Sequence, residues 1–387
     1  MERELYDEDH EAFREVVKEF CKRYVTTQHR EKWDADGEVD RATMLAAGEA
    51  GIIGLSVPEE FGGAGMLQDY RFRAIVNEET IKAGAGSLAG AFGIQDDLAV
   101  PYLVHMGTQE QKEKWLPGMA TGEVLGALAM TEPGAGSDLR GIKTPAKKVD
   151  GGYLVNGAKT FISSGKTADI VVTFVKTGEG NRPDAFSLLI LENGMDGFDH
   201  GKKLEKMGFH GHDTAELSFV DVFVPEANLI GGEEGKGFVQ LMMNLPLERL
   251  SIGVAAAAAS EAALAWTLEY TASREAFGKP IGDFQNTRFK IADVATTVDV
   301  LWAYVDRAIQ LYGRKELTAD EAAKVKFWST EREWEILDTC VQIFGGYGYI
   351  TEYPIARAFL DARVHRIYGG TNEIMREIVA RQVTGRK

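Results

Sequence analysis

The stretch that decides the fold is LERLSIGVAAAAASEAALAWTLEYTAS, from Leu247 to Ser273. Its apolar residues recur at helical spacing, which predicts one long helix. Two more segments with helical periodicity follow, at Thr287 to Gly313 and Ala319 to Phe344, and the pair Gly345-Gly346 ends the second of them. Long amphipathic helices joined by short links predict a C-terminal helical bundle over residues 241–387.

The alanine-rich run inside this stretch, Val254 to Ala259, is followed by Ser260 and Glu261. It falls well short of the ~20 apolar residues that a membrane span requires. We therefore interpret the run as a close contact between helices and predict no membrane span.

Upstream, a helical pattern extends from Asp9 to about Thr121 and opens with apolar residues at Phe13, Val16, Val17 and Phe20. A loop is indicated by the turn residues of PEEFGGAG, which begins at Pro58. These features predict an N-terminal helical domain at residues 1–125.

Between the two helical regions, residues 126–240 contain short runs rich in β-branched and aromatic residues. The predicted strands are Asp169 to Val175, Ala185 to Leu191 and Glu216 to Val224. Since no long helical pattern separates them, a small antiparallel barrel or sandwich is favoured over a parallel sheet with crossover helices. The fold class is therefore α+β, mostly α, with the order helical, β, helical.

Composition restricts the function. The chain of 387 residues carries a formal net charge of −16, which argues against binding to nucleic acid or to anionic membranes. Only Cys21 and Cys340 are present, so a reducing compartment is indicated. The N-terminus, MERELYDEDHEAFREVV, has neither a signal peptide's apolar core nor the acid-poor character of a transit peptide. We expect a cytoplasmic protein, or a mitochondrial matrix protein if a transit peptide has been removed.

Two segments have the residues of a ligand site. In AMTEPGAGSD, from Ala129 to Asp138, a strand leads into a turn where glycines allow close backbone approach; the Rossmann pattern is absent because its third glycine falls at Leu139. In GAKTFISSG, Phe161 stands beside hydroxyls at Ser163 and Ser164, which suits a flat heterocycle. Taken alone, AMTEPGAGSD is typical of a plain tight turn, and Phe161 in GAKTFISSG is typical of a core residue. The two segments together favour a ligand-binding site.

A third segment, SREAFGKPIGDFQ, places Arg274 just before Phe277 and Gly278, where a bend aims a guanidinium at an anion such as a pyrophosphate. An ordinary surface arginine is the alternative. His210 and His212 have no third ligand nearby in sequence, which indicates solvent exposure rather than a metal site. We predict no metal.

Six ordered segments carry a resemblance to a known family over nearly the whole chain. They are AMTEPGAGSDLRGIKT, NGAKTFISSG, KMGFHGHDTAELSFVDVFVP, SREAFGKPIGDFQ, QIFGGYGYITEYPIARAFLDARV and IYGGTNEIMREIVAR. The chain resembles the acyl-CoA dehydrogenase family, most of all its long-chain branch, and it shares one decisive feature with the isovaleryl-CoA dehydrogenase branch. The resemblance implies three domains, bound FAD, an acyl-CoA substrate, a homotetramer and electron transfer to an electron-transfer flavoprotein.

The same resemblance implies the cofactor-binding residues. Those expected to line the flavin are Leu128, Met130, Thr131, Gly136, Ser137, Phe161 and Ser163. Those expected at the pyrophosphate and adenine end, partly across a subunit interface, are Arg274, Phe277, Gln285, Gln342, Gly345 and Gly346, with Thr371 and Glu373 also touching FAD. Phe161 stands where many members have tryptophan.

The position of the catalytic base distinguishes the branches. The medium- and short-chain branches have a glutamate directly after the tyrosine equivalent to Tyr368, where this chain has Gly369. The long-chain and isovaleryl branches carry the base on a helix of the C-terminal domain, and Glu248 in LPLERL matches it. Without the family, a solvent-facing helix carboxylate is the plainer interpretation of Glu248.

The implied reaction is removal of the substrate's α-proton by Glu248 and transfer of the β-hydrogen to FAD as hydride, which yields a trans-2-enoyl-CoA. Gly369 is expected to donate its N–H to the thioester oxygen, and Arg249 to tune the charge of the base. The residues expected to wall the thioester are Ser137, Pro246, Leu247 and Gly370. Val239 replaces a tyrosine found in the long-chain branch, so the preferred acyl length stays open.

Two alternative functions are also compatible with the sequence. An acyl-CoA oxidase-like flavoprotein passes its electrons to oxygen. A non-catalytic subunit keeps the fold and joins another chain in a mixed assembly.

Overall fold

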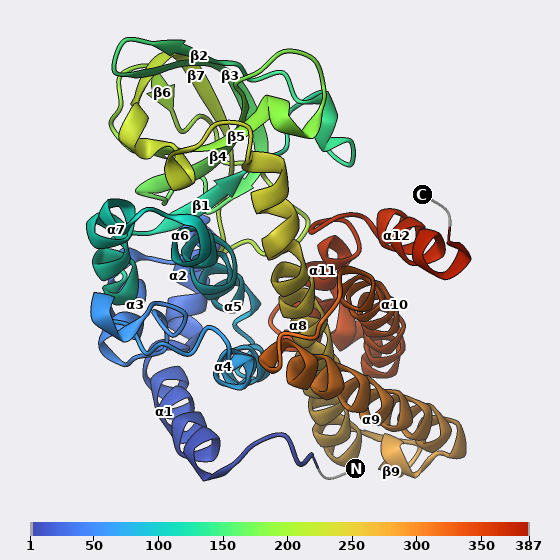
Figure 1. The fold of residues 1–387 in the computed structure, drawn as a ribbon. Helices are drawn as coiled ribbons and strands as arrows, with labels where there is room; N and C mark the ends of the chain where they lie inside the picture. The colour runs from blue at the N-terminus through green and yellow to red at the C-terminus, as the bar shows by residue number, and fades with distance from the viewer. Residues whose placement is uncertain (1–2, 386–387) are drawn as a thin grey trace.

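The computed structural model describes residues 3–385. Two groups of helices lie on either side of the long helix α8, and a β-sheet domain lies at one end of the molecule (Figure 1). Helix α8 descends from the β-sheet domain between the two helical groups. The predicted α+β class, mostly helical with the order helical, β, helical, is confirmed.

The N-terminal domain is helical. Its α-helices are α1 (Glu8–Tyr24), α2 (Thr27–Asp36), α3 (Arg41–Glu49), α4 (Tyr70–Lys82), α5 (Gly86–Gly93), α6 (Val100–Met106) and α7 (Gln109–Thr121). The predicted loop at Pro58 lies between α3 and α4 and contains the 3-10 turn η1 (Glu59–Phe61). A wider π-helical turn, η2 (Ile94–Ala99), joins α5 to α6.

The middle domain contains two sheets. Its strands are β1 (Gly126–Ala129), β2 (Ala146–Val149), β3 (Gly152–Ser163), β4 (Ile170–Lys176), β5 (Phe186–Glu192), β6 (Phe198–Asp199) and β7 (Thr214–Pro225). One sheet has the order β1-β4-β5 and the other β2-β3-β7-β6. Buried residues from both sheets, such as Val171, Leu189 and Phe219, share one core cluster, so the sheets pack face to face as a sandwich.

One part of the antiparallel prediction is wrong. Strand β1 pairs with β4 in parallel, with Gly126 opposite Ile170. Parallel neighbours need a long connection, and here the hairpin β2–β3 of the other sheet supplies it in place of a helix. The remaining pairings among β2 to β7 are antiparallel, as predicted.

The C-terminal domain is a helical bundle. Its elements are α8 (Gly237–Ser273), the hairpin β8 (Glu275–Ala276) and β9 (Lys279–Pro280), α9 (Gln285–Gly313), α10 (Ala319–Phe344), the 3-10 turn η8 (Gly345–Tyr349), α11 (Pro354–His365) and α12 (Asn372–Thr384). Helix α8 begins ten residues before the predicted Leu247 and contains Pro246. The apolar side chains of Leu241, Leu245 and Leu247 are buried around this proline, and their packing stabilises the helix where the proline removes a hydrogen bond.

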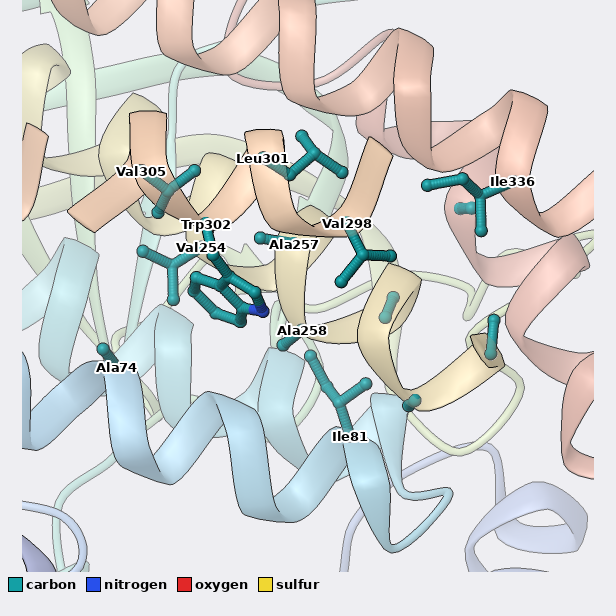
Figure 2. Close-up of a cluster of buried hydrophobic side chains, with 14 of the residues drawn as sticks. Ala74, Ile81, Val254, Ala257, Ala258, Val298, Leu301, Trp302, Val305 and Ile336 are labelled. Carbon is teal, nitrogen blue, oxygen red and sulfur yellow. The ribbon is translucent and has the colours of Figure 1, made fainter. Parts of the chain in front are cut away.

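The largest core forms where α8 meets α4, α9 and α10. Figure 2 shows Trp302 of α9 lying among side chains of α8 and α4, with Val254 and Ile81 close by. The alanines of α8 let the neighbouring helices approach closely, as the sequence indicated. By length and composition α8 passes as a membrane span, but 67% of its most apolar window is buried inside the protein, so it is a core helix.

Leu301 tests how much this core contributes to stability. Its side chain is fully buried, so Leu301→Ala removes apolar contacts and leaves a cavity. We expect a loss of about 3 kcal/mol, measured as a lower thermal unfolding midpoint. The control is Leu268→Ala on α8, the same change at a side chain that is 47% exposed, where the expected loss is under about 0.5 kcal/mol. Equal shifts in the two variants would contradict this placement of the core.

Candidate active site

Glu248 lies on α8 with only 3% of its surface exposed. The hydroxyl of Tyr102, fully buried on α6, donates a hydrogen bond of 2.9 Å to Glu248 Oε1. Among residues 3–385, no other hydrogen bond reaches the Glu248 carboxylate, so Oε2 has no protein donor. The alternative of a solvent-facing helix carboxylate is therefore wrong.

Burial sets the charge of this carboxylate. Removal from water raises the pKa of Glu248 to about 7, against the smaller opposing effects of the Tyr102 hydrogen bond and the Arg249 charge. Arg249 is itself buried, which lowers the pKa of its guanidinium. A carboxylate with a pKa near 7 is both available and basic at neutral pH, which suits a general base.

The glycine pair Gly369-Gly370 packs against the same helix. Both residues have left-handed backbone angles, with φ of 64° and 90°. A Cβ on Gly369 would lie 2.4 Å from Ile252 Cδ1, and one on Gly370 would lie 4.0 Å from Arg249 Nη2. The structure thus brings together the two distant segments, LPLERL and YGGTNEIM. Among residues 3–385, no acceptor takes the Gly369 N–H, which is free to donate to a ligand.

A buried lysine holds the glycine turn in place. Lys326 on α10 donates from Nζ to the Gly370 carbonyl at 2.9 Å and to Asn372 Oδ1 at 2.9 Å. Burial, reinforced by repulsion from Arg249, lowers the pKa of Lys326 to about 7. The turn is therefore fixed from one side by Lys326 and bounded on the other by α8.

The second part of the site is on the β-sheet domain. Phe161 of β3 is 68% exposed and has a φ of 59°, a strained value for an aromatic residue. The pairing of β3 with β7 shifts register between Lys159 and Ile162, so a bulge turns the ring out of the strand. The alternative of a core phenylalanine is wrong.

The glycine-rich loop that follows β1 is bonded to the same strand. Thr160 N–H donates to the Thr131 carbonyl at 2.9 Å, and Lys159 Nζ donates to the Met130 carbonyl at 2.9 Å. The buried Lys159 also pairs with Glu132 at 3.0 Å, which lowers the pKa of Glu132 against the opposing effect of burial. A Cβ added at Gly134 would meet no other atom within 4 Å, so the turn is open to a ligand.

The predicted residues for the pyrophosphate end lie elsewhere. Arg274 stacks over Tyr347 at 5.6 Å, which joins the β8–β9 hairpin to the glycine cluster after α10. Phe277 is 96% exposed with a φ of 52°, and the positions next to Gly345 and Gly346 are empty to 4 Å. Figure 1 shows β9 at the opposite end of the molecule from β1 to β7. Within one chain, the residues predicted to line the flavin and those predicted to bind the pyrophosphate and adenine therefore lie far apart.

The other predicted residues fall on these same elements. In the C-terminal domain, Gln285 is exposed at the start of α9, Gln342 is exposed near the end of α10, Thr371 caps α12 and Glu373 is exposed on the first turn of α12. In the β-sheet domain, Gly136 and Ser137 are exposed in the loop after β1, Leu128 is buried on β1 and Ser163 is half-buried at the end of β3. Pro246 and Leu247 come just before the base on α8. Their roles stay predictions.

The residues around Phe161 fit the isoalloxazine ring of FAD. An aromatic side chain held outward by a strained, bulged strand costs folding free energy that a stacked ring system recovers. Next to it, the open glycine turn offers hydroxyls at Thr131 and Ser137. The exposed side chains of Arg274 and Phe277 fit the other end of FAD. The guanidinium suits the charged pyrophosphate and the phenyl ring suits the flat adenine.

The expectation for the histidine pair is half correct. His210 is exposed, but His212 is buried, and its Nε2 lies 3.0 Å from Ser164 Oγ. Burial lowers the pKa of His212, so it remains a neutral hydrogen-bonding residue. Within residues 3–385 no group of three or more His, Cys, Asp and Glu side chains is arranged to hold a metal ion.

Sequence reasoning missed two residues of the site. Tyr102 lies 146 residues from its partner Glu248, and nothing in the local sequence PYLVHM marks it. Lys326 did carry a signal, because it occupies the apolar face of the predicted helix together with Ala322 and Ala323. A lysine at such a position is rarely buried without a specific partner.

The fold and site define a class: flavin-dependent oxidoreductases in which a β-sheet domain lies between two helical domains. Three family descriptions match the chain: "Acyl-CoA dehydrogenase, N-terminal domain" at residues 7–123, the middle domain at 127–222 and the C-terminal domain at 235–384. The chain belongs to the acyl-CoA dehydrogenase family, a family of FAD enzymes.

Named relatives agree with this assignment. The chain is 43% identical over 383 residues to the mitochondrial long-chain specific acyl-CoA dehydrogenase of Mus musculus, covering 98% of this chain and 88% of that protein. It is 37% identical over 381 residues to the mitochondrial isovaleryl-CoA dehydrogenase of Arabidopsis thaliana, covering 98% and 92%. The crystal structure of an acyl-CoA dehydrogenase from Geobacillus kaustophilus superposes with a TM-score of 0.94 at 41% identity, covering 98% of each chain.

Proposed function

We propose that this protein converts an acyl-CoA thioester to its trans-2-enoyl-CoA, with Glu248 as the base. The observation that carries the proposal is the buried Glu248 carboxylate, with a pKa of about 7, beside the left-handed turn at Gly369 and Gly370. A carboxylate in this environment is expected at a site of proton abstraction.

The protein's own residues act on the substrate as follows. Glu248 takes the α-proton, and the electron pair left on the α-carbon delocalises onto the thioester oxygen. The free N–H of Gly369 donates to that oxygen and stabilises its growing charge. The buried Arg249 keeps a positive charge beside the base and limits the rise in its pKa. The apolar surroundings of α8 exclude water, which strengthens each of these interactions.

When bound, FAD would supply the acceptor for the hydride that leaves the β-carbon as the double bond forms. Phe161 and the loop residues Thr131 and Ser137 would hold its ring system, while Arg274 and Phe277 would hold the other end. The proton would go to Glu248 and the hydride to the acceptor that FAD would supply, so the two hydrogens and two electrons that leave the substrate are all accounted for.

The separation of the two cofactor halves supports an assembly of copies. Because strand β3, which carries Phe161, and strand β9, next to Phe277, lie at opposite ends of one chain, a complete FAD site takes each half from a different copy. We therefore retain the homotetramer, with electron-transfer flavoprotein as the electron acceptor. The compartment stays a prediction: cytoplasm, or mitochondrial matrix after removal of a presequence.

An anaerobic titration tests the function. The purified protein with FAD bound is expected to lose its flavin absorbance when saturated acyl-CoAs of graded length and branching are added, because substrate oxidation reduces the flavin. The acyl-CoA that gives the most complete bleaching at the lowest concentration identifies the substrate class. Free CoA and the matching 2-enoyl-CoA serve as controls and should leave the oxidised spectrum.

The same preparation separates the alternatives. Turnover that reduces an artificial dye with little peroxide supports a dehydrogenase, whereas stoichiometric peroxide supports the oxidase-like function. Bleaching in a homogeneous preparation of this one chain excludes the non-catalytic subunit. Absence of bleaching with every acyl-CoA from short to long would overturn the proposal.

A further inference from the structure

Two residues of α6 contact one face of α8 around the base. Tyr102 donates to Glu248 Oε1 at 2.9 Å, and His105 Nδ1 lies 2.9 Å from Asn244 Oδ1. Tyr102 and His105 are three residues apart, and Asn244 and Glu248 are four apart. Each pair therefore lies on one face of its own helix, and the two faces meet.

A third contact continues the row by one more turn of α8. Ser251, three residues after Glu248, donates its hydroxyl to Asp97 Oδ2 at 2.7 Å. Asp97 is itself fixed, because Arg73 donates to both of its oxygens at 3.0 and 3.1 Å. The segment of α8 that carries the base is thus held at three successive positions by one continuous stretch of chain.

The π-helical turn η2 explains how one stretch reaches all three positions. In a regular α-helix, residues five apart such as Asp97 and Tyr102 point about 140° away from each other. In η2 the Val100 N–H bonds to the Gln95 carbonyl, five residues back, so this turn holds one residue more. The extra residue rotates Asp97 onto the side of Tyr102, and both face α8.

We propose that Tyr102 is the positioning residue of the base: its hydroxyl fixes Glu248 Oε1, so that Oε2 is presented for proton abstraction, and the π-helical turn before α6 sets this geometry. The inference rests on the proposed role of Glu248. Oε2 has no hydrogen-bond partner among residues 3–385, while Oε1 is held by the hydroxyl of the fully buried Tyr102. Tyr102 acts through its hydrogen bond to the base.

Two groups act directly on the ionisation of Glu248. The neutral hydroxyl of Tyr102, from α6, and the charged guanidinium of Arg249, on α8 itself, both favour the ionised carboxylate. From α10, Lys326 acts on Arg249. From η2, Asp97 faces the same segment of α8 but is neutralised by Arg73. Tyr102 is the only one of these groups that is hydrogen-bonded to the carboxylate within the described chain.

Tyr102→Phe removes the hydroxyl and keeps the ring. Because the hydrogen bond favours the ionised form, its loss should make Glu248 harder to ionise. In the wild type, kcat/KM should rise with pH through a midpoint near pH 7, since only ionised Glu248 accepts a proton. In Tyr102→Phe the midpoint should move to higher pH, which adds about a tenfold loss of kcat/KM at pH 6, the ratio for one pH unit. At pH 9, where Glu248 is ionised in both proteins, the loss that remains should come from the unfixed carboxylate alone.

A second readout does not depend on turnover. The infrared band of the protonated Glu248 carboxyl, identified by its absence in Glu248→Gln, should disappear on raising the pH with the same midpoint as the rate profile. It should shift in parallel in Tyr102→Phe. The control is Tyr153→Phe on β3, which removes a buried ring's hydroxyl from Glu234, 14 residues before the base in the loop that precedes α8, and should leave the pH profile unchanged.

The outcomes are distinct. If Tyr102→Phe leaves both midpoints and the kcat/KM at pH 9 at their wild-type values, the positioning role is overturned. If Glu248→Gln remains active, the base assignment itself fails, whatever Tyr102→Phe shows. A shift in both midpoints together with an inactive Glu248→Gln supports the inference.

Discussion

Glu248→Gln is expected to lower kcat by about 10³-fold, within the range that a general base contributes. Glutamine has nearly the same shape but does not accept a proton at neutral pH, so the α-proton has no acceptor at the site. The chain should still fold, because glutamine Oε1 accepts the Tyr102 hydrogen bond and a neutral amide is less costly to bury than a carboxylate. The measurement is kcat with the acyl-CoA that bleaches the flavin most completely.

The matched control for this variant is Glu269→Gln, the same change at an exposed position on the same helix. It should leave kcat within a factor of two. Flavin absorbance and the thermal unfolding midpoint check that Glu248→Gln retains FAD and its fold. A kcat within tenfold of the wild type would remove Glu248 from the role of base and direct attention to another carboxylate.

Local signals in the sequence were enough to place many of the helices. Helix α10 was predicted at its observed bounds, because both ends carry strong signals: Thr318 caps its start together with Glu321, and Gly345 has the positive φ of 60° that ends it. The start of α8 was missed, because a proline inside a helix is tolerated only when burial of the neighbouring residues offsets its cost.

Features that depend on distant residues were not predictable from pattern alone. The parallel pairing of β1 with β4 is one, because strand spacing does not state which strands become neighbours. The contact between Tyr102 and Glu248 is another. The meeting of LPLERL with YGGTNEIM was anticipated only through the family resemblance, since neither segment carries a local sign of the other.

The outward position of Phe161 shows the same limit. The residue types around it suggested a ligand, but a phenylalanine in a strand reads equally well as core. Its exposure follows from the bulge between Lys159 and Ile162, and that bulge follows from the pairing of β3 with β7. The residue types that suit a ligand were therefore recognisable in the sequence. The outward direction of the Phe161 ring depends on strand pairing, which only the fold shows.

Gly369→Ala is expected to lower kcat/KM by about 10²-fold, the loss that follows when one donor to a developing oxyanion is displaced. Alanine is strained at a φ of 64°, and its Cβ would lie 2.4 Å from Ile252 Cδ1, so the turn and the terminal methyl of Ile252 are pushed apart. The control is Gly180→Ala, at a φ of 73° with no atom within 4 Å of the added Cβ, which carries the strain alone and should keep full activity.

A second substitution separates the clash from the strain. Ile252→Val removes the Cδ1 atom, and the next atom near the added Cβ is Ile252 Cγ1 at 4.0 Å, an ordinary contact. Gly369→Ala with Ile252→Val should therefore recover at least tenfold of the lost kcat/KM, because the turn can return to its place while the strain at residue 369 persists. Full activity in Gly369→Ala alone would mean that the Gly369 N–H does not serve the thioester oxygen. Loss without recovery in the double variant would assign the effect to backbone strain, and the contact of the glycine turn with α8 would then have no part in holding the donor.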